Sequence, residues 1–404
     1  MYIGILGRQS ELGLAELERV FGNARRFSPE TALLDSSLKP DVEHLGSVMK
    51  VGQIIEILPP KSNNSDWKTV SFKLVRLFTQ RLKNQSGKIT LGISVYGFNQ
   101  ISPKDVQKTG LVLKSKLGSL RLIPNTDLTL STATTHHNKL GLSSSKIEIL
   151  VVRGSDGSVA VAESLGSQNI TALAKRDQGR PKRDAFVGML PPKLAITMIN
   201  LAAGSELSRQ ALDSSKTHDD SFAPRLLDPF CGTGVLLQEA SLLGYKIYGT
   251  DLAEKMIRYS ESNLDWLSQE IVRHPIDYSL EVGDATNHKW QAPINVIAAE
   301  TYLGQPFSAP PSPAKLTEVM RTCDGIISDF LRNLGSQVKP GTPACLAIPA
   351  WRDKNGDFSH LPLVGQLGKL GWNRLGLSST NIDNLLYYRE DQVVARELLI
   401  LTKI

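Results

Sequence analysis

LLDPFCGTGVLLQEASLLGYKIYGTD, residues 226–251, predicts a strand, a glycine turn, a helix and a second strand in direct succession. The first strand ends at Asp228, and residues 230–234 form a turn whose glycines let a ligand approach the backbone. The second strand ends in Asp251, about 20 residues beyond the turn, where a nucleotide-binding fold places the carboxylate that holds ribose hydroxyls. The stretch therefore predicts a Rossmann-like α/β domain with a ligand at this turn.

The glycine spacing differs from the G-x-G-x-x-G pattern of dinucleotide binders, which disfavours a hydride-transfer cofactor. D-P-F-C-G-T-G resembles the S-adenosylmethionine (SAM) loop of class I methyltransferases, in the variant found in RNA and DNA amino-methylases. SAM carries no phosphate, so the turn needs only glycines that admit its amino-acid part and a carboxylate for its ammonium group. The alternative is an ordinary strand–turn–helix with a structural glycine pair. We expect the cofactor to contact Asp228, Phe230, Gly232, Gly234, Asp251 and Leu252.

The composition of the chain is that of a globular protein with two or three domains: 404 residues, 41% hydrophobic and 21% charged. No apolar run approaches the ~20 residues of a membrane span, and the N-terminus lacks a signal-peptide layout. Three cysteines, Cys231, Cys323 and Cys345, are far apart and odd in number. They predict a reducing, cytoplasmic location and no metal site.

Charge is unevenly distributed along the chain, whose net charge is +6. Residues 1–183 carry 26 Lys and Arg against 15 Asp and Glu, whereas residues 184–404 carry 20 against 25. A basic front half attached to a mildly acidic domain indicates that the front half binds a polyanion. The alternative is a solvated basic surface.

The front half predicts a strand-rich α+β module. Strands are expected at residues 2–6, 31–35, 47–58, 88–96, 120–123, 147–152 and 159–162, and helices at 11–21, 67–82 and 103–117. Residues 136–139, HHNK, are expected to form a turn, and adjacent histidines are not a metal pair because they do not share one face. The basic helix and the strand after it supply candidate RNA contacts: Lys104, Lys108, Lys114 and Arg121.

A second basic segment leads into the methyltransferase-like domain. Its cations make phosphate contact a better interpretation than a solvated hinge, and they are Lys175, Arg176, Arg180, Lys182 and Arg183. An amphipathic helix is expected to start at Pro191-Pro192. Residues 203–223 are polar and lack periodicity, so we expect a surface loop there.

Five segments of the chain, taken in order, resemble THUMP-domain tRNA guanine-N2 methyltransferases, the archaeal and eukaryotic enzymes that modify guanosine 10 of tRNA. They are MYIGILGRQSELGLAELE, LSTATTHHNKL, AKRDQGRPKRDAFVGMLPPKLAITMINLA, LLDPFCGTG and LLYYREDQVVARELLIL. The resemblance implies a ferredoxin-like and THUMP module (1–165) that docks tRNA, a basic linker (166–190) and a Rossmann-like methyltransferase domain (191–404). It also implies SAM as cofactor, tRNA as partner and, in some family members, a small activating protein subunit.

The resemblance extends to the order of elements in the second half. It implies a mostly parallel seven-stranded sheet that ends in an antiparallel hairpin, formed here by LLYYRED and QVVARELLILTKI. Helices are expected at 254–264, 316–334 and 363–370, and strands at 278–282, 294–299 and 344–348. After the third strand, the family places an acidic residue and a small residue beside the adenine, here Asp284 and Ala285; the alternative for Asp284 is a surface turn.

The fourth strand leads into E-T-Y-L-G, residues 300–304, where the family carries D-P-P-Y-G. In the family, two acceptors bind the hydrogens of a guanine amine and favour its pyramidal transition state, while the aromatic residue stacks on the base. The corresponding candidates are Glu300, Thr301 and Tyr302; for Tyr302 the alternative is a lid or core aromatic.

This motif departs from the family pattern, since Glu300 adds a methylene and both prolines are absent. Binding of SAM is therefore better supported than turnover. The sequence predicts a cytoplasmic, SAM-dependent tRNA methyltransferase that forms N2-methylguanosine, with no membrane attachment. The alternatives are a catalytically impaired, SAM-fold tRNA-binding protein and a DNA amino-methyltransferase.

Overall fold

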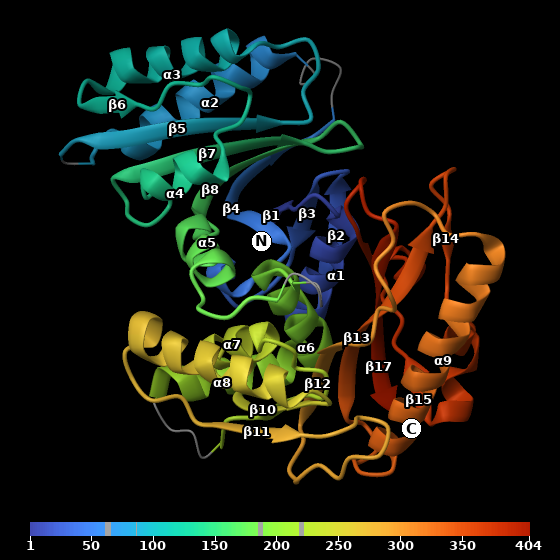
Figure 1. Ribbon diagram of the computed structural model, residues 1–404. Coiled ribbons are helices and arrows are strands. Elements are labelled where there is room, and N and C mark those ends of the chain that lie inside the picture. The colour runs from blue at the N-terminus through green and yellow to red at the C-terminus, as the bar shows by residue number, and fades with distance from the viewer. Residues whose placement is uncertain (61–65, 86, 185–188, 218–221) are drawn as a thin grey trace. The chain divides into compact units, whose positions relative to one another are not determined.

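The computed structural model of the protein describes residues 1–60, 66–85, 87–184, 189–217 and 222–404. The chain divides into two compact units, Met1–Ala172 and Leu173–Ile404 (Figure 1). The linker expected at 166–190 is not one separate segment. Strand β8 (Val159–Ser167) enters it, helix α5 (Ile170–Gln178) occupies its middle, and residues 185–188 lie outside the described part.

The first unit is built on an eight-stranded sheet in the order β2-β3-β1-β4-β8-β7-β5-β6. β5 runs parallel to β6 and β7, and the remaining pairs are antiparallel. Besides β8, the strands are β1 (Tyr2–Leu6), β2 (Ala24–Ser28), β3 (Thr31–Leu34), β4 (Val48–Leu58), β5 (Ile89–Tyr96), β6 (Leu120–Leu122) and β7 (Lys146–Arg153). The predicted strand-rich α+β module is thus confirmed, with one addition: β2, whose sequence ARRFS lacks a strict alternation.

The helices of the first unit are α1 (Ser10–Phe21), η1 (Val42–His44), α2 (Trp67–Leu82), α3 (Pro103–Leu117) and α4 (Thr132–His137). α2 and α3 pack on strands β5 and β7 through a core that includes Val70, Phe78 and Leu113. The turn expected at 136–139 is present at Asn138 and Lys139, but His136 and His137 end helix α4 instead. Ser131 caps a short helix there, because its hydroxyl accepts a hydrogen bond from the Thr134 amide at 3.1 Å.

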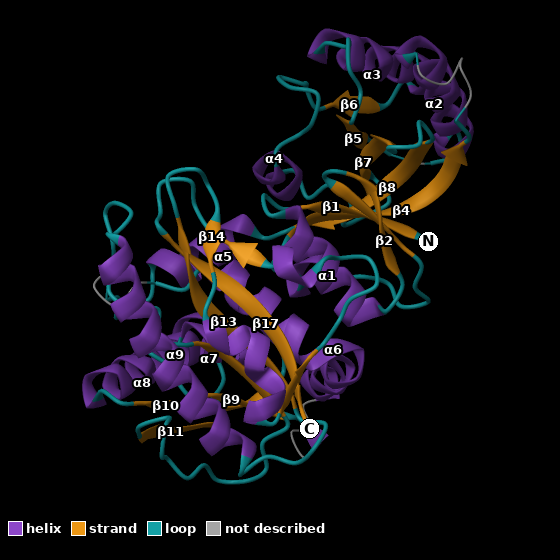
Figure 2. Cartoon of the chain, turned by 90° about the vertical axis from the view of Figure 1, so that its right-hand side faces the viewer, coloured by secondary structure: helices purple, strands orange, loops and turns teal. Residues whose placement is uncertain are grey.

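The second unit contains a nine-stranded sheet. Its main path is β11-β10-β9-β12-β13-β17-β15, and two short strands, β14 and β16, pair with β13 and β17. The strands are β9 (Arg225–Asp228), β10 (Lys246–Asp251), β11 (Tyr278–Val282), β12 (Val296–Glu300), β13 (Pro343–Arg352), β14 (Phe358–Ser359), β15 (Trp372–Arg374), β16 (Leu386–Tyr387) and β17 (Val394–Lys403). The first five strands of the path are parallel. β17 pairs antiparallel with β13, and the two lie side by side in Figure 2.

Numbered along the chain, the seven strands of the main path lie in the order 3-2-1-4-5-7-6. This is a Rossmann-like half followed by an antiparallel seventh strand, as the sequence predicted. The predicted hairpin is present but small, since β16 has only two residues. The edge partner of β17 is instead β15, which the sequence did not indicate. Because parallel strands end at one edge, Asp228, Asp251 and Glu300 terminate three neighbouring strands at the same edge.

Helices cover this sheet, and most follow the predicted bounds. They are α6 (Pro192–Thr217), α7 (Val235–Leu242), α8 (Glu254–Leu267), the π-helical turn η4 (Ser268–Val272), α9 (Pro313–Gly335), η5 (Pro362–Leu370) and η6 (Ile382–Asn384). α9 and η5 bury a core against β9 and β12 that includes Leu227, Ile297 and Phe330. α6 and α7 pack on each other, and α7 contacts β9 and β10.

The loop expected at 203–223 is wrong for its described part up to Thr217, because α6 continues to that residue. The helix kinks at Gly204, where φ is 65°, and then presents Leu207, Ala211 and Ser214 on one face. Ala211 is fully buried, and its carbonyl lies against Gly244. Tertiary packing therefore holds a polar segment in a helix that local sequence does not favour.

Candidate cofactor and substrate site

The turn between β9 and α7 has the geometry that its sequence predicted. Gly232 and Gly234 adopt left-handed conformations, with φ of 51° and 78°. The Phe230 amide donates to Asp228 Oδ1 at 3.1 Å, and the Gly232 amide donates to Asp251 Oδ2 at 2.9 Å. Asp251 Oδ1 accepts from the Ala253 amide at 2.9 Å. The carboxylate at the end of β10 is therefore fixed to the turn by backbone bonds.

The two glycines of the turn have different structural roles. A Cβ on Gly232 would meet nothing closer than the Phe230 carbonyl, 3.9 Å away, so this side of the turn is open. A Cβ on Gly234 would lie 2.9 Å from Ser260 Oγ and 3.2 Å from Ser260 Cα on α8. Gly232 therefore leaves room for a ligand, while Gly234 allows α8 to pack closely against the turn.

Asp228 and Asp251 form an acidic site at the carboxyl edge of the sheet. Burial raises the pKa of Asp228 well above its usual range, and the nearby charges of Asp251 and Glu300 act in the same direction. Burial also raises the pKa of Asp251, against the two backbone hydrogen bonds that lower it. A cation placed here would relieve the cost of ionising these carboxyl groups, so the site suits a positively charged ligand.

Three exposed apolar or aromatic side chains lie just at or after the ends of successive strands. Leu252 follows β10, Val282 ends β11 and Tyr302 follows β12, with exposed fractions of 73%, 50% and 45%. Large exposed side chains of this kind at a strand edge are suited to cover the flat face of an adenine or a guanine. Val282 was missed in the sequence, although it is the last apolar residue before Gly283. Phe230 is directed elsewhere, since its ring packs edge-on against Phe330 with centroids 5.0 Å apart.

The residues expected beside the adenine lie directly after β11. Asp284 Oδ1 accepts from the Thr286 amide at 2.9 Å and from its hydroxyl at 2.7 Å. Ala285 is only 4% exposed, and its carbonyl accepts from Asn333 Nδ2 at 3.0 Å. Asp284 thus closes a turn at the sheet edge, while the Ala285 side chain belongs to the hydrophobic core.

The three residues expected to act on the substrate have different environments. Glu300 ends β12, and its Oε1 accepts a hydrogen bond from Arg396 Nε on β17. Thr301 is buried, and both its amide and its hydroxyl donate to the Ala347 carbonyl, at 3.0 and 3.1 Å. The Thr301 side chain therefore anchors the start of the turn to β13 and is not free to act on a substrate. Tyr302 is exposed, which rules out a core role for its ring.

The predicted RNA-contacting cations separate into exposed and internal groups. Exposed cations are Lys104, Lys108, Lys114 and Arg121 in the first unit, and Lys175, Lys182 and Arg183 in the second. Two predicted contacts are internal instead. Arg176 forms a bidentate ion pair with Glu239 of α7, at 2.7 and 2.9 Å, and the Arg180 side chain is buried. The Arg176–Glu239 pair joins residues 63 positions apart in the chain, which local sequence does not reveal.

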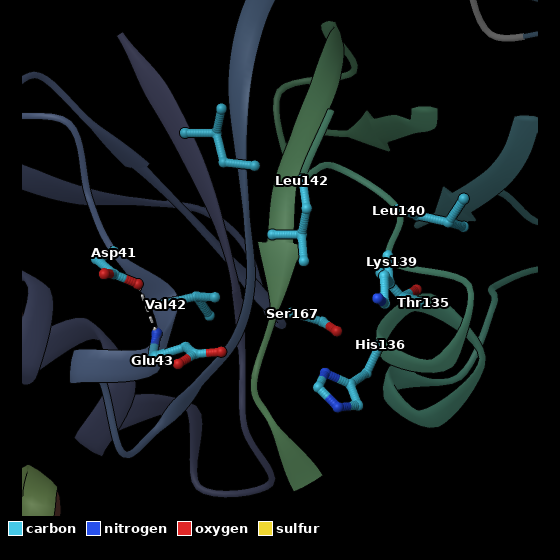
Figure 3. A pocket seen from close by; sticks show the side chains of 10 residues that line it. Asp41, Val42, Glu43, Thr135, His136, Lys139, Leu140, Leu142 and Ser167 are labelled. Atoms are coloured by element: carbon cyan, nitrogen blue, oxygen red, sulfur yellow. Dashed lines mark hydrogen bonds between the residues drawn. The ribbon is translucent and has the colours of Figure 1, made fainter. Parts of the chain in front are cut away.

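A small cavity of about 210 Å³ lies within the first unit. Figure 3 shows Asp41 and Glu43 on one side of it and Thr135, His136 and Lys139 on the other. Leu142 and Ser167 lie between the two sides. The lining carries both charge signs, so the cavity gives no support for polyanion binding.

Two further properties concern metal ions and membranes. Across the described ranges, no group of three or more His, Cys, Asp or Glu side chains is arranged to bind a metal ion. In the same part of the chain, no helix is both long and apolar enough to span a membrane. All three cysteines, Cys231, Cys323 and Cys345, are buried.

The strand order and the glycine turn together define the Rossmann-like fold of class I methyltransferases. The chain is 35% identical over 100 residues to the tRNA (guanine(10)-N2)-dimethyltransferase of Pyrococcus abyssi, which covers 25% of this chain and 23% of that protein. It is 28% identical over 179 residues to the protein of the same name from Methanothermobacter thermautotrophicus, 44% of each chain. These matches confirm the family resemblance predicted from the sequence, and they span less than half the length of the curated relatives.

Among solved structures, the chain is similar to TrmN from Thermus thermophilus, with 17% identity and a TM-score of 0.49 over 100% of this chain and 99% of that one. No family model matches the chain.

Proposed function

We propose that the protein is a SAM-dependent tRNA methyltransferase that acts on the exocyclic N2 amine of a guanosine, of the position-10 type. The observation that carries this proposal is the acidic site at Asp228 and Asp251, whose pKa values are raised by burial next to an open glycine turn. SAM is a cation at its sulfonium and its ammonium, so it supplies the charge that this site lacks. The names of the archaeal relatives support tRNA as the substrate.

In this proposal the residues of the turn hold the cofactor. Asp228 accepts from the ammonium group, Asp251 accepts from the ribose hydroxyls, and the open face at Gly232 lies against the amino-acid part. Leu252 and Val282 cover the adenine, and Asp284 accepts from its amine. When bound, SAM supplies an electrophilic methyl group.

The substrate guanine is proposed to lie on the exposed Tyr302 ring, with its amine directed at Glu300. Arg396 occupies Glu300 Oε1, and no side chain in the described part donates to Oε2. Oε2 is therefore left to accept a hydrogen of the guanine amine, which favours the pyramidal nitrogen of the transition state. The exposed cations of the first unit, with Lys175, Lys182 and Arg183, are proposed to contact tRNA phosphates.

A second candidate function is a non-catalytic tRNA-binding protein that retains the fold. The observation that favours it is the pairing of Glu300 with Arg396, together with the internal bonds of Thr301. A DNA amino-methyltransferase is a third candidate, against which the tRNA-modifying relatives argue. A cytoplasmic location, inferred from three cysteines that are odd in number and far apart in the sequence, belongs to the same proposal.

Isothermal titration with SAM and a methylation assay on unmodified tRNA test these candidates. If the protein is the proposed methyltransferase, it should bind SAM and incorporate methyl groups into tRNA as N2-methylguanosine. Glu300→Ala should lose this incorporation and still bind SAM. Tight binding of SAM and tRNA without incorporation would favour the non-catalytic reading, and incorporation into DNA alone would favour the third. Turnover by the purified chain without added protein would exclude a requirement for an activating subunit.

A further inference from the structure

Arg180 is a buried cation without a hydrogen-bond partner. Its side chain is 3% exposed, and none of its three guanidinium nitrogens is hydrogen-bonded within the described ranges. Burial lowers the pKa of the guanidinium, although an arginine in a protein stays charged. Proteins rarely bury such a charge without compensation, because the lost hydration is not recovered. Within the described ranges the guanidinium is therefore free to bind an anion.

Two anchors hold the segment that carries Arg180 close to α7. On one side, Arg176 binds Glu239, in the second turn of that helix. On the other side, the backbone of Lys182 exchanges two hydrogen bonds with Asn263, both at 2.9 Å. Asn263 Nδ2 also donates to the Thr233 carbonyl at 2.8 Å, immediately before α7 begins. The segment is thus tied to Glu239 of α7 at one end and, through Asn263, to the residues just before α7 at the other, and Arg180 lies between these anchors in the sequence.

The first turn of α7 is itself suited to an anion. The N-cap is Gly234, which has no side chain to accept from the first amides, and the first turn contains no acidic residue. Uncapped amides at a helix N-terminus attract negative charge. The acids near Arg180 do not bind its guanidinium. Glu239 is paired with Arg176. The charge of Asp177 raises the pKa of the Arg180 guanidinium but forms no hydrogen bond with it.

We propose that Arg180 binds the carboxylate of the methionine part of the methyl donor, an assignment that rests on the proposed function. The amino-acid end of SAM carries an ammonium and a carboxylate on one carbon. Asp228 lies at one end of the turn at 229–234, and the first turn of α7 lies at the other, so the two charges meet groups of opposite sign. A guanidinium forks two parallel hydrogen bonds to a carboxylate, which gives geometric selection as well as attraction.

The competing partner is a tRNA phosphate. A phosphate is the larger group and stays on the outside of the nucleic acid, whereas Arg180 is almost fully covered. Lys182 and Arg183, in the same segment, are exposed and are better placed for that contact. Arg180 and Arg183 therefore provide a matched pair, one buried and one exposed, three residues apart.

The test compares two ligands by isothermal titration. S-adenosylhomocysteine carries the carboxylate, and S-adenosyl-3-thiopropylamine keeps the adenosine, thioether and ammonium but lacks it. The wild-type protein is expected to bind S-adenosylhomocysteine roughly 10- to 100-fold more tightly than the amine analogue, because a hydrogen bond to a charged group contributes about this much. Arg180→Met should bind S-adenosylhomocysteine roughly 10- to 100-fold more weakly than wild type does, with an unchanged affinity for S-adenosyl-3-thiopropylamine. Arg183→Met should leave both affinities unchanged. Arg180→Lys should retain part of the preference.

Thermal unfolding separates a binding role from a structural one. Removal of an unpaired buried charge should leave the Tm of ligand-free Arg180→Met equal to or above that of wild type. An equal loss of affinity for both ligands, or an unchanged affinity for S-adenosylhomocysteine, would overturn the assignment. If Arg180→Met instead bound tRNA more weakly and kept the wild-type preference for S-adenosylhomocysteine, the assignment would also be overturned. Arg180 would then be a contact to a tRNA phosphate. Wild type that binds neither ligand would refute the proposed function itself, and the assignment with it.

Discussion

Arg396 Nε donates a hydrogen bond to Glu300 Oε1, which joins β17 to the end of β12 across β13. The two side chains are 10% and 16% exposed, so the ion pair is largely removed from water. Arg396 fixes the direction of the carboxylate and compensates its charge. The turn at 300–304 contains no proline, and this ion pair supplies a restraint on Glu300.

The first prediction concerns the two members of this pair. Glu300→Gln keeps an oxygen acceptor but removes the charge that Arg396 needs, and Glu300→Ala removes the acceptor as well. We expect Glu300→Ala to lower the single-turnover rate of methyl transfer by about a hundredfold or more, as for loss of one transition-state hydrogen bond, with an unchanged Kd for SAM. Single-turnover methylation of tRNA and titration with SAM measure the two quantities.

Arg396→Met is the companion variant. It leaves a partly buried carboxylate unpaired, so we expect a loss of about 3 kcal/mol in the free energy of unfolding. Urea unfolding measures it. The double variant Glu300→Gln/Arg396→Met should be more stable than Arg396→Met alone. Equal stability of the two would show that the unpaired Glu300 carboxylate carries no cost.

The second prediction is a pH dependence that originates in Asp228. Burial holds the pKa of this carboxyl above its value in the unfolded chain, about 4. The folded state therefore binds the proton more tightly, and stability is fully present below pH ~4 and is lost as pH rises through the raised pKa. Asp228→Asn should remove this part of the pH dependence and raise Tm at pH 8. Tm against pH, measured without ligand for both proteins, tests it.

The same carboxyl predicts the opposite trend for binding. The ammonium of the donor stabilises ionised Asp228, so affinity for S-adenosylhomocysteine should increase with pH until that group is ionised. Asp228→Asn should bind weakly, with this dependence removed. An Asn variant that bound as well as wild type at every pH would exclude Asp228 as the ammonium acceptor.

The third prediction uses the two glycines of the turn as a matched pair. Gly234→Ala combines a left-handed conformation with a Cβ 2.9 Å from Ser260 Oγ, so we expect a loss of about 2–4 kcal/mol in stability. Gly232→Ala meets open space and should cost only about 1 kcal/mol, from its φ of 51°. Ligand affinity should fall in Gly232→Ala even though its fold is retained. Thermal unfolding and titration with S-adenosylhomocysteine distinguish the two effects.

Elements set by local sequence signals were predicted, whereas elements that depend on distant parts of the chain were missed. β11 was predicted with its observed bounds, Tyr278–Val282, because periodicity and the glycine after it are local signals. β15 and the helix through Ala211 were missed, since both depend on partners far away in the chain. Within the site, the position of Asp251 was predictable from spacing. The burial of Arg180 was not, because it requires the anchors of its segment on α7 and α8.

The fourth prediction concerns a buried ion pair in the first unit. Lys50 and Glu148 are 2% and 0% exposed, and Lys50 Nζ also donates to the Leu130 carbonyl at 2.7 Å. Glu148 accepts from Ser94 and Thr135, so removal of Lys50 leaves a buried carboxylate without its counter-charge. Lys50→Met should destabilise the first unit by about 3–5 kcal/mol.

Because the ion pair lies wholly within the first unit, its loss should affect the two ligands differently. tRNA affinity should fall in Lys50→Met while the Kd for S-adenosylhomocysteine is unchanged. An equal loss of both would show that the second unit does not maintain its site without the first. Lys139→Met, an exposed substitution in the same unit, serves as the control.

The fifth prediction tests the basic surface of the first unit. Lys104, Lys108 and Lys114 are exposed on α3, and only Lys108 has an acidic neighbour in its own helix, Asp105 at 3.7 Å. If these lysines contact phosphates, each change to Gln should weaken tRNA binding and lower the slope of log K against log salt by about 1. The matched control neutralises three exposed lysines of the second unit, Lys289, Lys339 and Lys369, which alters net charge equally. Equal slopes for the variant with all three α3 lysines changed and for this control would mean that net charge alone, and not α3, accounts for tRNA binding.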